Sequence, residues 1–159
     1  MDQARTVSSV VPHAISEKVN GLIGLFSVIP HDVIALIARI SVSAVFWQSG
    51  QTKLDGWHVS SNAVYLFQNE YKVPLIDPLV AAHVAALSEF LFPVLLVIGL
   101  ASRFSALALL GMTLVIEIFI YPEAWPTHGT WAACFLLVIA RGPGLFSLDH
   151  LVARKLGRS

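Results

Sequence analysis

One carboxylate in the middle of a long apolar stretch constrains this chain more than any other feature. Glu89 lies within residues 79–100, LVAAHVAALSEFLFPVLLVIGL, which are otherwise almost entirely apolar. A helix of that length, rising about 1.5 Å per residue, spans the roughly 30 Å hydrocarbon core of a bilayer. A charged side chain at such a depth costs about 2.5–3.5 kcal/mol on insertion scales. We therefore expect a membrane protein in which Glu89 faces protein or a wet cavity and has a partner.

The composition favours a single membrane domain and argues against several other classes of protein. Of the 159 residues, 56% are hydrophobic and 13% are charged, whereas an ordinary soluble domain is about 25% charged. The formal net charge is zero, so no nucleic-acid partner is expected. Cys134 is the single cysteine of the sequence, which excludes an intrachain disulfide and a cysteine-based metal cluster.

Four apolar stretches are predicted to cross the lipid bilayer as helices. They are residues 33–50, 79–100, 104–121 and 127–141. The last two connections are short, so neighbouring helices are expected to run in opposite directions. We predict an all-α integral membrane protein, an antiparallel four-helix bundle at residues 33–149. Residues 1–32 are predicted to form a cytoplasmic or interfacial segment, and residues 150–159 a basic C-terminal tail.

Lysine and arginine are distributed unevenly between the two ends of the predicted bundle. The N-terminal segment, the connection between the second and third helices, and the chain from Arg141 onward hold seven of them. The two opposite loops hold only Lys53 and Lys72. Cytoplasmic segments of membrane proteins carry such an excess of positive residues. Both termini are therefore predicted to be cytoplasmic, with Arg141 at the cytoplasmic end of the fourth helix.

Polar residues of the first predicted helix share one face. At 100° per residue, Arg39, Gly50 and Lys53 lie within about 40° of one line. Lipid offers no partner to such a stripe, so it is expected to face the bundle interior, with Gly50 allowing another helix to approach closely. Arg39 is predicted to pair with Glu89, because both lie near the middle of their helices. This seam is either a structural ion pair or a functional site.

A second polar group is predicted in the outer half of the bundle. Gln48, His83, Glu117 and His128 all fall toward the outside in the predicted orientation. Carboxylates and histidines in apolar surroundings can relay protons or bind a polar head group such as a quinone ring. Solvated or packing roles are the alternative. The chain has no Glu-x-x-His repeat and no His-Glu-x-x-His motif, so no metal site is predicted.

Two shorter segments have amphipathic patterns. Apolar residues of 19–29 fall on one helical face, which is typical of a helix lying on a membrane surface. Residues 59–71 alternate apolar and polar positions at roughly helical spacing, and this loop is expected to lie over the outer mouth of the bundle.

The ordered set of these residues resembles the DoxX family of small bacterial membrane proteins. The resemblance runs from about Arg39 to Asp149. The residues that carry it are Arg39, Phe46, Gly50-x-x-Lys53-Leu54, Tyr71-Lys72-Val73-Pro74, Glu89, Gly99-Leu100-x-x-Arg103, Arg141-Gly142-Pro143-Gly144 and Leu148-Asp149.

The resemblance implies a four-helix, multi-pass protein of the bacterial inner membrane. The related DoxD protein is a subunit of an archaeal thiosulfate:quinone oxidoreductase, and mycobacterial DoxX works with a sulfurtransferase and a superoxide dismutase. By this resemblance, Arg39, Lys53, Glu89 and Arg141 are the positions expected to matter most.

Three functions follow as alternatives. The first is a subunit or accessory of a membrane redox complex, linked to quinone or to sulfur and oxidative-stress chemistry. The chain has no motif for haem, flavin or an iron–sulfur cluster, so a membrane or peripheral protein partner would supply the electrons. The second is a non-catalytic structural subunit of a larger homo- or hetero-oligomeric membrane assembly, and the third is a small-molecule transporter.

Overall fold

The computed structural model of the protein describes residues 17, 21, 24 and 28–157. The chain divides into two units, residues 1–30 and residues 31–159. The surface helix predicted at residues 19–29 lies mostly outside the described residues. The second unit, called here the helical unit, contains the helices described below and the candidate site.

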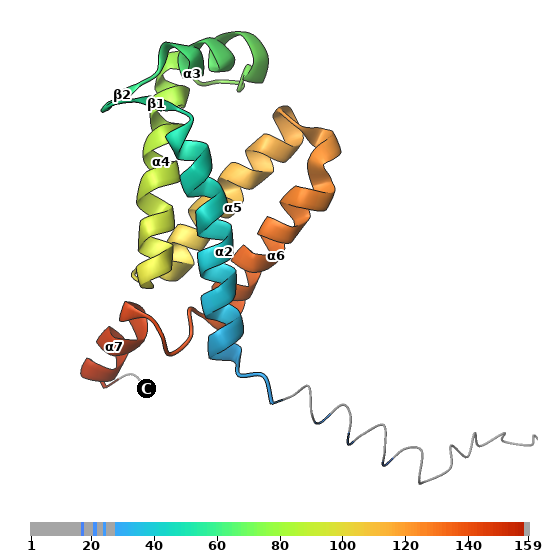
Figure 1. The fold of residues 1–159 in the computed structure, drawn as a ribbon, viewed down its shortest axis with the longest axis vertical. Helices are drawn as coiled ribbons and strands as arrows, with labels where there is room; N and C mark the ends of the chain where they lie inside the picture. The colour runs from blue at the N-terminus through green and yellow to red at the C-terminus, as the bar shows by residue number, and fades with distance from the viewer. Residues whose placement is uncertain (1–16, 18–20, 22–23, 25–27, 158–159) are drawn as a thin grey trace, which may run out of the picture. The chain divides into compact units, whose positions relative to one another are not determined.

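The helical unit is built almost entirely from helices (Figure 1). In chain order its elements are α2 (His31–Gln51), β1 (Leu54–Asp55), β2 (His58–Val59), α3 (Ser61–Leu66), the π-helical turn η1 (Phe67–Tyr71), α4 (Pro78–Ile98), α5 (Ser102–Phe119), the 3₁₀ turn η2 (Pro122–Ala124), α6 (Trp125–Arg141) and α7 (Leu148–Lys155). The two short strands form an antiparallel hairpin in which Leu54 lies opposite Val59. Each of the four predicted long helices is present, with ends within two residues of those expected.

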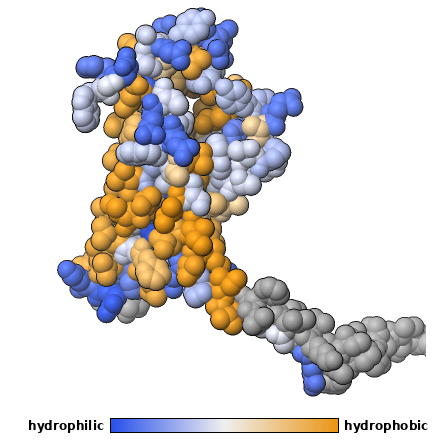
Figure 2. Space-filling view, in the orientation of Figure 1, coloured by the Kyte–Doolittle hydropathy of each residue, from blue (hydrophilic) through white to orange (hydrophobic). Residues whose placement is uncertain are grey.

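Three helices in the described part of the chain are long and apolar enough to cross a membrane, namely α2, α4 and α5. The fourth long helix, α6, has 17 residues and is shorter. Large apolar side chains on the outer faces remain exposed, among them Ile37, Leu87, Leu107 and Ile118. Figure 2 shows these faces as an apolar band with hydrophilic residues toward the ends. The protein is therefore an all-α membrane protein, as the sequence predicted.

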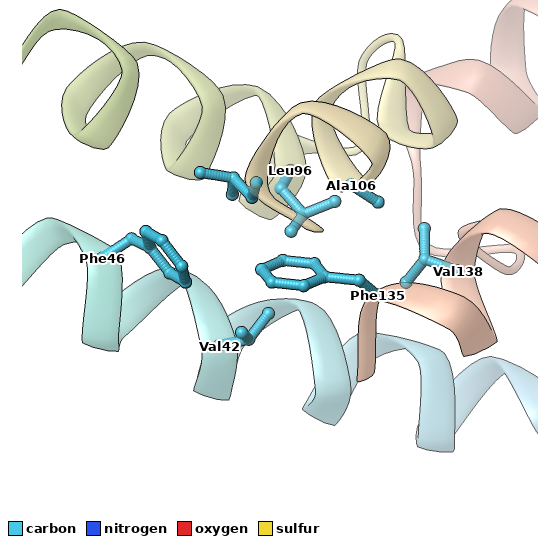
Figure 3. Close-up of a cluster of buried hydrophobic side chains, with 7 residues drawn as sticks. Val42, Phe46, Leu96, Ala106, Phe135 and Val138 are labelled. Carbon is cyan, nitrogen blue, oxygen red and sulfur yellow. The ribbon is translucent and has the colours of Figure 1, made fainter. Parts of the chain in front are cut away.

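The four long helices pack around a small apolar core. Helix α2 packs against α4 and α6, and α5 packs against the same two helices. Consecutive long helices run in alternate directions (Figure 1). The core consists of Val42, Phe46, Leu96, Ala106, Leu109, Phe135 and Val138, each almost fully buried (Figure 3). The rings of Phe46 and Phe135 meet edge to face, 5.6 Å apart, and this packing joins α2 to α6.

The C-terminal segment is attached to the helical unit by long-range hydrogen bonds. The Asp149 carboxylate accepts from the backbone nitrogens of Ala101 and Ser102, each at 2.8 Å. The Asp149 backbone nitrogen donates in turn to the Gly99 carbonyl at 2.8 Å. A carboxylate is favoured there because the first backbone N–H groups of a helix lack intrahelical partners. Asp149 therefore caps α5 from a distant part of the sequence.

Helix α7 covers much of the segment that was predicted as a basic C-terminal tail. That tail was expected at residues 150–159, and α7 begins at Leu148 and continues to Lys155, with Arg154 and Lys155 in its last turn. Ser147 accepts a hydrogen bond from the His150 backbone nitrogen and so caps the helix. A serine immediately before the first residue of a helix is a typical N-cap, so Ser147 was the sequence feature that could have predicted this helix.

The turn between α4 and α5 offers a direct test of this packing. Gly99 ends α4 at φ +75°, and a Cβ there would overlap Arg39 and Ser147. We expect Gly99→Ala to destabilise the protein by about 1–3 kcal/mol, because it adds backbone strain and a clash. Gly111→Ala is the matched control, since a Cβ on Gly111 in α5 meets nothing within 4 Å. Thermal unfolding in detergent measures both variants, and equal midpoints would contradict this account.

Candidate functional site

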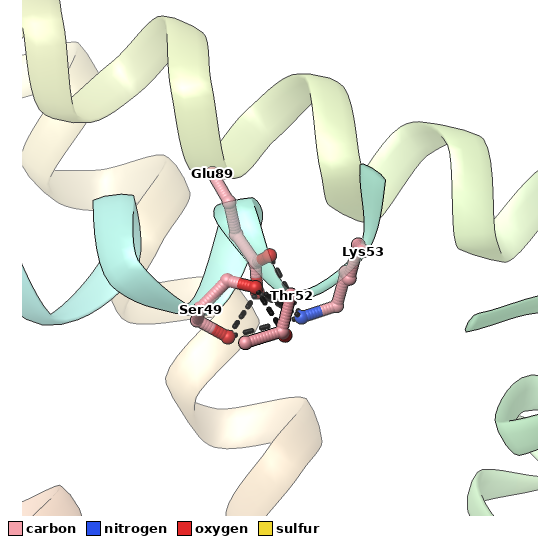
Figure 4. A network of polar contacts seen from close by, with 4 residues as sticks. All are labelled: Ser49, Thr52, Lys53 and Glu89. Atoms are coloured by element: carbon pink, nitrogen blue, oxygen red, sulfur yellow. Dashed lines mark hydrogen bonds and ion pairs between the residues drawn. The ribbon is translucent and has the colours of Figure 1, made fainter. Parts of the chain in front are cut away.

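Glu89 is buried in α4 and pairs with the end of α2 (Figure 4). The Lys53 ammonium lies 2.8 Å from Oε2 and 2.9 Å from Oε1 of Glu89. The Ser49 hydroxyl donates to Oε1 at 3.1 Å and accepts from Lys53 at 3.0 Å. The Glu89 side chain is 3% exposed and the Lys53 side chain 13%. The buried carboxylate thus has a cationic partner. Glu89, Lys53 and Ser49 are together called the Glu89 group.

Gly50 allows this arrangement because it brings α2 close to α4. A Cβ placed on Gly50 would lie 3.1 Å from the Cβ of Glu89 and 3.1 Å from a ring carbon of Phe90. Such contacts are tighter than side chains ordinarily tolerate. The small residue therefore has the packing role that the sequence predicted for it.

The predicted pairing of Arg39 with Glu89 is wrong. Arg39 is fully buried, and its Nη2 donates to the Phe146 carbonyl at 2.6 Å. Because α2 and α4 are antiparallel, Gly50 lies opposite Glu89, and Arg39 lies beside Gly99. Aligning the midpoints of the two helices had placed Arg39 about 12 Å too near Glu89 along the helix axis. Arg39 therefore belongs to the C-terminal attachment and lies away from the Glu89 group.

Glu117 of α5 and His128 of α6 form a second polar pair. His128 Nδ1 lies 2.6 Å from Glu117 Oε2. The imidazole is almost completely buried, and its centre lies 4.8 Å from the ring of Trp131. These two members of the predicted outer group do come together, because α5 and α6 are neighbours in the sequence and pack against each other.

The other two members of the predicted outer group lie elsewhere. His83 is exposed, and its Nδ1 lies 2.7 Å from the Leu79 carbonyl. It lines a separate, open depression with Trp47 and Trp57. Gln48 is exposed on α2. Outer depth alone therefore could not define the group, because it does not specify which face of each helix points inward.

The Glu89 group and His128 line one cavity of about 320 Å³. Glu89, Lys53 and Ser49 contribute from α4 and the end of α2, and His128 contributes from α6. The remaining lining is largely apolar and includes Phe46, Phe67, Val84, Val115, Ile116 and Trp131. A few polar groups in an apolar cavity of this size are typical of a small-molecule site. Two of these lining residues, Ser49 and Trp131, were not among the residues predicted for a site. Ser49 could have been found, because it lies one helical turn before Lys53.

The segment at residues 59–71 lies over this cavity, as predicted. Phe67 packs against Ala81 and Ala82 of α4, and it lines the cavity together with Tyr71. The ring of Tyr71 also meets that of Tyr121, with the centres 6.2 Å apart. Figure 2 shows the surface hollowed between the end that carries α3 and the turn joining α5 to α6. Aromatic side chains thus border the cavity on the side of η1 and of the turn joining α5 to α6.

The chemistry available to this cavity is hydrogen bonding inside apolar walls. Although Lys53 lies near it, Glu89 Oε2 receives no well-aligned hydrogen bond within the described residues. It can accept one from a bound molecule. The three ammonium protons of Lys53 already have acceptors, of which the Ser49 carbonyl at 3.4 Å is the most distant. Arg141 is exposed at the end of α6 and is not a lining residue. Among the described residues, no group of three or more histidine, cysteine, aspartate or glutamate side chains is placed to hold a metal ion.

Removing Lys53 should destabilise the protein because it leaves the Glu89 carboxylate buried without its cation. We expect Lys53→Met to cost about 2–4 kcal/mol, somewhat below a fully buried pair because Lys53 is partly exposed. Lys72→Met changes an exposed lysine and serves as the control. Adding Glu89→Gln to Lys53→Met should recover part of the loss, since no charge then remains buried. Unfolding in detergent measures the cycle, and a Lys53→Met loss no larger than that of Lys72→Met would refute the pairing.

The phenol of Tyr71 should lose its proton at an unusually high pH because of its surroundings. Burial, and then its interaction with the Tyr121 hydroxyl, raise the pKa of Tyr71 to about 12. A raised pKa in the folded state means that this contribution to stability is complete below pH 10 and declines as the pH rises toward 12. We expect ultraviolet absorbance titration to show one late phenol that is absent in Tyr71→Phe and retained in Tyr65→Phe. A late phenol that persists in Tyr71→Phe would assign it to another residue.

Comparison with known proteins assigns the chain to a family. The DoxX family model matches residues 34–122, which is more than half of the chain and includes Lys53, Glu89 and Glu117. An uncharacterized protein from Haemophilus influenzae is 30% identical over 129 residues, covering 75% of this chain and 83% of that protein. No solved structure matches. The chain belongs to the DoxX family.

Proposed function

We propose that this DoxX-family protein is a subunit of a membrane redox complex and that its cavity holds the head group of a quinone or quinol. The observation that carries the proposal is the cavity itself. Its walls are apolar, and Glu89, Lys53, Ser49 and His128 supply hydrogen-bonding groups on different helices. A redox partner protein would supply or accept the electrons.

The lining residues fit such a head group in three respects. A quinone ring has oxygens that accept hydrogen bonds, and Lys53 can donate to one of them in place of the Ser49 carbonyl, its most distant acceptor at 3.4 Å. A quinol has hydroxyl groups that donate, and Glu89 Oε2 can accept from one of them. The faces of the ring are apolar, and Phe46 and Trp131 offer aromatic surfaces beside the polar groups. Such a molecule carries electrons and protons between membrane proteins, and this chain would bind and orient it.

The proposal includes an orientation in the membrane. We place α6 as a fourth span beside α2, α4 and α5, with both termini on the cytoplasmic side of a bacterial inner membrane. The excess of lysine and arginine at that end supports this orientation. The exposed apolar side chains of α7, including Leu151 and Val152, support a position at the inner interface. The cavity would then lie in the outer half of the bilayer.

A structural subunit of a larger membrane assembly is the second candidate function. It is favoured by the fact that both polar pairs connect neighbouring elements. Lys53, just after α2, pairs with Glu89 of α4, and Glu117 of α5 pairs with His128 of α6. Buried polar pairs can set helix register without any ligand. Under this function the cavity would be a consequence of packing.

Glu89→Gln separates the two candidates. Under the redox proposal we expect about tenfold weaker quinol binding, because the amide replaces a charged acceptor and loses about 1.4 kcal/mol or more. Quinol titration of the detergent-solubilised protein, followed by tryptophan fluorescence, gives the dissociation constant. Glu123→Gln is the control, since Glu123 is exposed in η2 outside the cavity. Parent protein that binds no quinol, or equal affinities in both variants, would support the structural function instead.

A further inference from the structure

The cavity that holds Glu89 reaches the protein surface through an apolar opening inside the membrane-spanning helices. Two of its lining residues are exposed in spanning helices, Val84 of α4 at 56% and Val115 of α5 at 36%. Ile76, just before α4, is 49% exposed and lines the same cavity. The polar lining residues Glu89 and His128 are, by contrast, only 3% and 4% exposed. The cavity therefore has a deep polar part and an apolar edge.

The depth of this opening determines what can pass through it. Val84 lies about 9 Å along α4 from its first residue, and Glu89 lies about 16 Å along the same helix. Val115 lies about 6 Å from the last residue of α5. Both valines are therefore within the length that hydrocarbon surrounds. Lipid chains meet the opening there, and a free polar solute would have to cross them first.

We infer that the ligand of this cavity is an amphipath with an apolar chain, and that it enters sideways from the bilayer between α4 and α5. Its compact head carries a hydrogen-bond donor that reaches Glu89 Oε2, the buried oxygen without a well-aligned donor. Its chain passes Val84 and Val115 and continues into the lipid. This inference rests on the proposed function for the site and extends it to the shape and route of the ligand.

Trp131 provides a reporter inside the cavity. It lines the cavity and is only partly exposed. We would replace Trp47, Trp57 and Trp125 with phenylalanine, so that Trp131 is the single tryptophan of the full chain. The protein is reconstituted into phosphatidylcholine vesicles whose acyl chains are brominated, and the fluorescence is compared with that in unbrominated vesicles. Bromine quenches an indole that it approaches closely, so a chain within the opening should quench Trp131 at least twofold.

Three variants test the route. Val84→Phe with Val115→Phe should remove at least half of the quenching, because larger side chains fill the opening. Val84→Ala with Val115→Ala should increase the quenching, and it tests the same opening without added bulk. Val94→Phe is the matched control, since Val94 is an exposed valine of α4 outside this cavity. Absence of quenching in the parent, or equal quenching in all variants, would overturn the inference.

A second measurement tests the entry route of the apolar chain separately from the binding of the head group. Quinols that have the same ring, with and without a ten-carbon chain, are titrated against the parent protein and the two double variants. We expect the chain to tighten binding at least tenfold in the parent and to lose most of that gain in Val84→Phe with Val115→Phe. Bromolipid quenching without quinol binding would support the route and overturn the quinol proposal. Binding of both quinols with equal affinity would overturn the route and leave the quinol proposal intact.

Discussion

The antiparallel register of α2 against α4 is the constraint on which the rest of the structure depends. It places Gly50 against Glu89 at one level and Arg39 beside Gly99 at another. Each buried charge thereby receives a different partner, Lys53 for Glu89 and the Phe146 carbonyl for Arg39. A sliding of either helix by one turn would leave charges without partners in apolar surroundings, at a cost of several kcal/mol.

This register also separates two regions of the helical unit, one around Arg39 and one around Glu89. Around Arg39 the unit is closed, because Asp149 caps α5 and the chain that leads into α7 is held by backbone hydrogen bonds. The apolar core around Phe135 lies between the long helices and links them. Around Glu89 the same helices enclose the cavity, which η1 and the rings of Tyr71 and Tyr121 border. The closed region and the cavity thus lie at different levels along the same helices.

The two polar pairs at the cavity differ in which of their atoms can still form a hydrogen bond. Lys53 and Ser49 donate to Oε1 of Glu89, and Oε2, which lies 2.8 Å from the Lys53 ammonium, keeps the capacity to accept a further hydrogen bond. Glu117 occupies Nδ1 of His128, so the other ring nitrogen is the one that can act toward the cavity. Lys53 neutralises much of the charge of Glu89, which lets this pair exist among apolar side chains. The hydrogen-bonding capacity that remains at Glu89 and His128 is the feature on which the proposed binding of a neutral polar head group rests.

The sequence by itself determined the class of protein, the four long helices and the inward face of α2. Those features follow from apolar length and from the 100° repeat of a helix, which are local properties. It also indicated that the segment carrying Phe67 lies over the mouth of the bundle. The sequence did not determine the partner of Glu89, the separation of His83 from Glu117, or the helix α7 that begins at Leu148. Only the tertiary structure decided these, because axial register and the rotation of one helix against another depend on how Gly50, Phe90 and Gly99 pack, and helical periodicity is the same for every register.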